Sequence, residues 1–155
     1  MARRYDPEFA VADRFKAYLE ATLSEALTLK SPVVTFYDPM AQDDAARIVV
    51  FPQEFDSETN SPQNWSGEVQ ITVKSQCAQK TMKKDIEAHA DKTNEVREAL
   101  LRSEMLTELN NGVGLGISFI SRAMKFKTDV VQGWIYSDAI FDVKCHAREA
   151  ADDVS

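Results

Sequence analysis

Cysteine and histidine are scarce in this chain. Its 155 residues include two cysteines, Cys77 and Cys145, and two histidines, His89 and His146. Two cysteines are too few for a disulfide framework, and no pair of these residues has a zinc-ligand spacing such as C-x₂-C. Neither an H-E-x-x-H motif nor a G-x-S-x-G elbow is present. We therefore expect no metal, no cofactor and no catalytic residues, and hence no enzyme.

Long apolar runs are also lacking. No stretch approaches the roughly 18 apolar residues needed to cross a bilayer. The first nine residues, MARRYDPEF, carry two arginines but no apolar run behind them, so they do not predict a signal peptide. We expect an intracellular protein that has no membrane partner.

Positive charge is in deficit, because 18 Lys and Arg face 25 Asp and Glu, a formal net charge of −7. This balance argues against tight non-specific DNA binding, which needs clustered cations. It is compatible with a surface that DNA passes without sticking, because like charges repel. Two short basic segments, 74–84 and 122–129, favour salt bridges or a protein partner over nucleic acid.

Glycine is rare, yet three of the five glycines alternate in NNGVGLGISF, at Gly112, Gly114 and Gly116. A phosphate-binding loop follows a strand and opens a helix, whose N-terminus attracts the anion. Here the expected order is the reverse, so the adjacent helix end is the C-terminus, with a negative dipole. We therefore predict a flexible corner that contacts a neighbouring subunit, not a nucleotide site.

Two segments have helical periodicity. Asp6, Pro7 and Glu8 form a helix start signal, and apolar residues then recur at helical spacing until Pro32. The second and stronger helix covers 81–109 and is followed by the stop signal Asn111-Gly112. Both helices are amphipathic and must bury an apolar stripe.

Five segments are expected to be strands. Residues 65–77 alternate cleanly, with Val69, Ile71 and Val73 on one face. The remaining four are shorter or less regular; they cover 32–38, 46–52, 117–129 and 130–147. The element order is therefore helix, three strands, helix and two strands. It predicts a two-layer α+β domain, with an antiparallel or mixed sheet of about five strands and two helices packed on one face.

We expect the whole chain, 1–155, to form a single domain with its core in about 8–147. The acidic tail, 148–155, is expected to be frayed. Residues 53–64 contain many turn formers and predict a flexible, projecting loop. Within and beside it, Glu54, Phe55, Asp56 and Glu58 are candidate contacts to a partner or subunit, because an exposed aromatic residue often anchors a protein contact.

The order of these parts resembles the tail terminator, or tail completion, proteins of long-tailed bacteriophages and prophages. The resemblance lies in the amphipathic helix before PVVTFYD, in GEVQITVKSQC running into DIEAHADKTNEVREALL, and in the final strands that end in YSDAIFDVKCHA. It covers about residues 8–147, nearly the whole chain. It rests on architecture and not on a short motif.

This resemblance implies a structural virion protein, located in the tail or neck and in the host cytoplasm during assembly. Such proteins form a hexameric ring that caps the tail tube and docks to the head–tail connector protein. The implied partners are other copies of the chain, the tail tube protein, the connector, and phage DNA that passes through the lumen without specific binding. The family has no catalytic residues to carry over.

Three alternatives remain open from the sequence. The nearest is a head-completion or neck adaptor protein of the head–tail connector. Another class is a small-molecule-binding module or enzyme that uses the glycine loop. A third is a regulatory or chaperone-like adaptor, in which the acidic segment 53–64 binds a basic partner.

Overall fold

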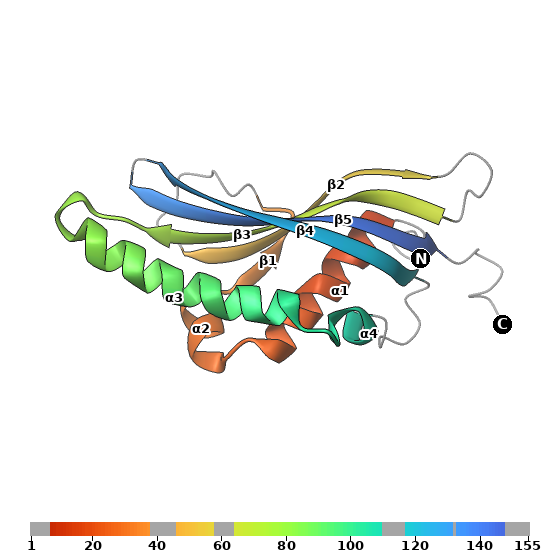
Figure 1. The fold of residues 1–155 in the computed structure, drawn as a ribbon, viewed down its shortest axis with the longest axis horizontal. Coiled ribbons are helices and arrows are strands. Elements are labelled where there is room, and N and C mark those ends of the chain that lie inside the picture. The colour runs from red at the N-terminus through yellow and green to blue at the C-terminus, as the bar shows by residue number, and fades with distance from the viewer. Residues whose placement is uncertain (1–6, 38–45, 58–63, 110–116, 132, 148–155) are drawn as a thin grey trace.

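The structure is a computed structural model, and it describes residues 7–37, 46–57, 64–109, 117–131 and 133–147. The predicted order of helices and strands is confirmed (Figure 1). In chain order the elements are α1 (Pro7–Thr22), α2 (Glu25–Lys30), β1 (Val33–Thr35), β2 (Arg47–Ser57), β3 (Asn64–Gln76), the 3₁₀ turn η2 (Gln79–Thr81), α3 (Met82–Leu101), α4 (Met105–Leu109), β4 (Ile117–Val131) and β5 (Trp134–Ala147).

The strands form one mixed five-stranded sheet in the order β1-β2-β3-β5-β4. β1 is parallel to β2, and the other neighbouring strands are antiparallel. The helices lie on one face of this sheet (Figure 1). The predicted two-layer α+β fold is confirmed.

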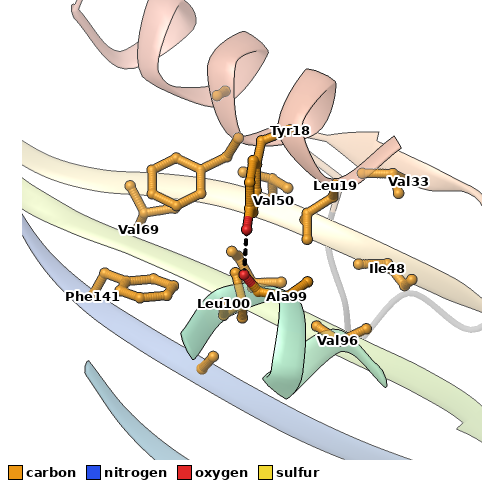
Figure 2. Packing of buried hydrophobic residues seen from close by; sticks show 14 of the residues in the cluster. Tyr18, Leu19, Val33, Ile48, Val50, Val69, Val96, Ala99, Leu100 and Phe141 are labelled. Carbon is orange, nitrogen blue, oxygen red and sulfur yellow. Dashed lines mark hydrogen bonds between the residues drawn. The ribbon is translucent and has the colours of Figure 1, made fainter. Parts of the chain in front are cut away.

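The core lies between the helices and the sheet. It joins Leu19 of α1 and Leu100 of α3 to the inward faces of β2, β3 and β5 (Figure 2). The inward set on β3 is the predicted one, Val69, Ile71 and Val73, all buried. Within this apolar layer the hydroxyl of Tyr18 donates to the carbonyl of Ala99, which ties α1 to α3.

Each expected helix ends earlier than its periodicity predicts. The first divides at Ser24, whose hydroxyl accepts from the amide of Leu27 at 3.3 Å and caps α2. Glu95 of α3 fixes this corner, since its carboxylate accepts from the amide and hydroxyl of Ser24 at 2.6 and 3.0 Å. The second helix is interrupted at Arg102, which has ψ 135°, and α4 follows. These breaks turn the chain so that α2 and α4 also pack on the core.

Four expected strand boundaries were wrong. β1 stops at Thr35, because Phe36 has φ 53° and leaves the extended conformation. The final hairpin turns at Gly133, with φ 84°, so β4 continues through Val131 and β5 begins only at Trp134. Pro52 does not end β2, because β1 covers only Ile48 to Val50 and no described strand lies beside Pro52 on the outer edge.

Candidate functional site

The prediction that Phe55 is an exposed anchor in a projecting loop was wrong. β2 continues through Ser57, and Phe55 is only 7% exposed and belongs to the core. A register shift between Gln53 and Asp56 inserts one extra residue into β2 at this point. Gly67 on β3 provides the space, because a Cβ atom there would overlap the Phe55 ring. The polar residues around Phe55 favour a loop, whereas the structure has a bulged strand there.

The other predicted contact residues are only partly placed. Glu54 and Asp56 lie on the same bulged part of β2, and Asp56 is exposed. Glu58 lies outside the described residues, as does half of the segment predicted to be a flexible loop, residues 58–63. The glycine segment also lies outside them. Its flanks follow the expected order, because α4 ends at Leu109 and β4 begins at Ile117.

The carboxyl end of α4 is held by a buried cation. The guanidinium of Arg14, which is 5% exposed, donates to the carbonyl of Leu109. A cation at this position complements the negative end of a helix. Burial lowers the pKa of Arg14, although an arginine stays protonated at any physiological pH. The segment before the glycines therefore ends on an internal contact.

A buried polar network links α3 to the sheet. Both ring nitrogens of His89 lie 2.8 Å from serine hydroxyls, Nδ1 from Ser75 of β3 and Nε2 from Ser137 of β5. The Ser137 hydroxyl also lies 2.8 Å from the hydroxyl of Thr128 on β4. Burial, and secondarily the charge of Lys92, lowers the pKa of His89 to about 4. The imidazole is therefore neutral at pH 7, with one nitrogen donating and the other accepting.

This network is not arranged as an accessible nucleophile and base. His89, Ser75 and Ser137 are 3%, 4% and 5% exposed, so a substrate cannot reach them without opening the domain. Sequence reasoning missed both serines. The available signal was the alternation of side chains along each strand, because Ser75 and Ser137 lie at positions that continue the inward-facing series of β3 and β5. The network holds three strands and a helix together.

A four-residue zinc set is not assembled. Cys77 lies at the turn end of the sheet, where its amide donates to the carbonyl of Gly133 at 2.9 Å. Cys145 lies toward the far end of β5, 11 residues beyond Trp134, which is roughly 37 Å of extended chain. Among the residues that the structure describes, no cluster of three metal-ligating side chains occurs.

A hollow beside the network lies between α3 and the last two strands. Thr93 and Arg97 line it from α3, and Lys127 and Ser137 line it from β4 and β5. It has room for about one water molecule, which is far smaller than a typical small-molecule pocket. This hollow gives no support to the ligand-binding alternative.

The sheet carries a hydrogen-bonded polar row on the face opposite the core. Gln53 donates to Gln70 at 3.0 Å, Gln70 to Thr72 at 3.3 Å, and Thr72 to Asp138 at 2.7 Å. The row crosses β2, β3 and β5. It adds side-chain hydrogen bonds to the backbone pairing of these three strands.

β4 and β2 differ in how much of their outer side is paired with another described strand. β4 has 15 residues and is the last strand in the sheet, so only its β5 side is paired within the described chain. β2 is covered on its outer side only by β1, which pairs with Ile48 to Val50. The rest of β2, Phe51–Ser57, has no described strand beside it. Unpaired backbone on both sides of a sheet is a surface that can pair with another chain.

Apolar side chains are exposed where the hairpin turns. Val130 and Val131 are 52% and 41% exposed at the end of β4. Met82 and Ile86, in the first turns of α3, are also exposed. Figure 1 places the start of α3 and the β4–β5 turn at the same end of the molecule.

No family model matches this sequence, and no curated protein matches it. Within the described residues, no helix is long and apolar enough to cross a membrane.

Proposed function

We propose that this protein is a structural, non-enzymatic subunit of a ring that caps the tail tube of a long-tailed phage and joins it to the head connector. The observation that carries the proposal is a sheet in which β4 and the outer half of β2 each have a side that no described strand pairs with. It adds a means of assembly to the resemblance drawn from the order of parts.

A sheet of this kind suits head-to-tail association. When two different surfaces of one chain bind each other, the copies form a closed ring if the rotation between them closes. Two distinct sheet edges are two such surfaces. Pairing of β2, β3, β5 and β4 in one continuous sheet sets the separation between them.

The buried chemistry supports a structural role. The His89 network consists of groups that satisfy one another inside the core. The net charge of −7 suits a ring through which DNA passes without specific binding. We place the assembled protein in the tail or neck of the virion, and in the host cytoplasm during assembly.

The first test is the mass of the purified chain by light scattering over a concentration series, paired with negative-stain images. Rings of about six subunits are expected, alone or on purified tail tubes. Capture by the tail tube protein supports the terminator assignment, whereas capture by the connector alone indicates a neck adaptor. A chain that forms no ring in either setting, and binds neither partner, overturns the proposal.

A further inference from the structure

We infer that copies of this chain bind one another through their sheets, with the edge of β4 in one copy pairing antiparallel to the outer half of β2 in the next. The inference rests on the proposed ring and identifies the surfaces that form it. The partner is a second copy of this chain.

The two edges have opposite charge. β4 contains Arg122, Lys125 and Lys127 against the single acidic residue Asp129, a formal charge of +2. The outer half of β2, Phe51–Ser57, contains two acidic residues and no basic one, a formal charge of −2. Opposite charges on neighbouring strands stabilise their pairing, and like charges destabilise it.

This difference in sign selects the mode of association. Pairing β4 with β4 sets +2 against +2, and pairing β2 with β2 sets −2 against −2. Only the mixed pair brings opposite charges together. Symmetric dimers through either edge are therefore disfavoured, and a head-to-tail series is favoured.

Strand direction fits the same arrangement. β2 is antiparallel to β3, β3 to β5 and β5 to β4, so β4 runs opposite to β2 within one copy. A neighbour placed beside β4 with its helices on the same side therefore presents its own β2 antiparallel to β4. The sheet then continues from copy to copy while all helix layers stay on one side.

The registers also determine how the two edges can overlap. Asp56 lies level with Ser121, whereas Lys127 lies level with Val49, which already pairs with Val34 of β1. Copies without a shift would therefore set β4 against the neighbour's β1. A shift of six residues along the strands, from Ser121 to Lys127, places Lys127 beside Asp56 of the neighbour and the end of β4 beyond β1, so opposite charges stand directly across the new pair.

The pairing segment on β2 is short. Pro52 has no amide hydrogen to donate, and the bulge interrupts the register between Gln53 and Asp56. A single contact of this kind is weak. Ring closure, or docking on a symmetric tube, makes successive contacts intramolecular and raises their effective concentration.

The test uses two charge reversals in the full chain. Lys125→Glu with Lys127→Glu makes β4 acidic, and Glu54→Lys with Asp56→Lys makes the outer half of β2 basic. Each double variant alone presents like charges at every mixed contact, so its self-association by light scattering should weaken at least about tenfold. An equimolar mixture should regain assembly, because each reversed edge then meets its complement, and the rings alternate between the two variants.

Matched controls carry the same charge changes on exposed positions of α3, Lys83→Glu with Lys84→Glu and Glu87→Lys with Glu98→Lys. These should assemble like the wild type. Circular dichroism verifies that all four variants are folded, and recovery in the mixture shows directly that the two reversed chains are competent.

The possible results distinguish the edge pairing from the ring function. Rings that survive both reversals overturn the edge pairing but leave the ring function standing. Folded reversals that do not recover in the mixture also overturn it. Open head-to-tail chains that respond to the reversals but never close, in solution or on tubes, support the edge pairing and overturn the ring. A wild-type chain that stays monomeric at millimolar concentration and on tubes overturns both.

Discussion

At the scale of single residues, the most consequential feature is a neutral histidine inside the core. His89 connects α3 to Ser75 and Ser137, and its contacts require the uncharged ring. Its pKa of about 4 lies below the unfolded value of 6.5, so the unfolded chain binds more protons between these values. This site therefore contributes its full stability above pH 6.5 and loses it as the pH falls toward 4.

We predict that the free energy of unfolding falls by about 2 kcal/mol from this site between pH 7 and pH 5. Urea denaturation at both pH values measures the difference. His89→Gln keeps a neutral polar side chain, lowers stability at pH 7 and removes this part of the pH dependence. If the variant shows the same decrease as the wild type between pH 7 and pH 5, the histidine is not its source.

A second residue-scale prediction concerns the fit between Gly67 and Phe55. A Cβ atom at Gly67 would overlap the Phe55 ring, so Gly67→Ala should destabilise the domain by about 1–3 kcal/mol. The smaller side chain in Phe55→Leu should relieve the clash. In a double-mutant cycle by urea denaturation, the combined variant should be less destabilised than the sum of the two single variants. Strict additivity would show that the two residues do not press on each other.

At the scale of elements, two adjacent leucines at the end of α3 differ sharply in burial. Helical periodicity places both Leu100 and Leu101 in the buried stripe; Leu100 is fully buried, but the prediction for Leu101 was wrong, because it is 55% exposed. We predict that Leu100→Asp unfolds the domain, because it buries an unpaired charge at a cost of several kcal/mol. Leu101→Asp is the matched control, and its thermal unfolding should resemble that of the wild type. A cooperative, native-like melt of Leu100→Asp would contradict this placement.

The strands show why element boundaries are harder to predict than elements. The alternation in β3 is clean, because one face lies against the core and the other against polar neighbours. In β2 the bulge shifts the alternation, so Phe55 changes parity and reads as an isolated aromatic residue in a polar loop. Periodicity along one strand cannot reveal a bulge, because a bulge is defined by two residues of that strand lying opposite a single residue of its partner.

At the scale of the whole molecule, charge and unpaired edges dominate the expected behaviour. With a net charge of −7, we predict no retention of double-stranded DNA at physiological salt, with a dissociation constant weaker than about 10⁻⁴ M. A gel-shift titration measures this, both for the monomer and for any ring that forms. Tight, salt-sensitive DNA binding would contradict the view that DNA passes without specific contact.

The sequence by itself determined the fold class, the order of elements and the inward face of β3, but only part of the inward face of α3, because Thr93, Val96 and Leu100 are buried as predicted whereas Ile86, Ala90 and Leu101 are exposed. The confirmed features follow from hydrophobic periodicity, which is local and repeats over many residues. Phe55 could not be assigned from it, because a bulge changes the alternation at that residue. Alternation places Ser75 and Ser137 on the inward face, but their hydrogen-bond partner His89 comes from an element that periodicity does not position. The candidate contacts were partly visible, since Asp56 and the basic segment 122–129 were singled out without any indication that they lie on opposite edges of one sheet.

Only the tertiary structure decided the order β1-β2-β3-β5-β4, and with it which strands have an unpaired side. Strand order depends on long-range pairing, in which each candidate register gains similar hydrogen bonds and differs mainly in what it buries. The charges of β2 and β4 can be counted from the sequence alone. Their placement on opposite sides of the molecule follows from packing, because β5 buries Phe141 and Val143 in the core and pairs with β3 on one side and β4 on the other, which leaves β4 outermost.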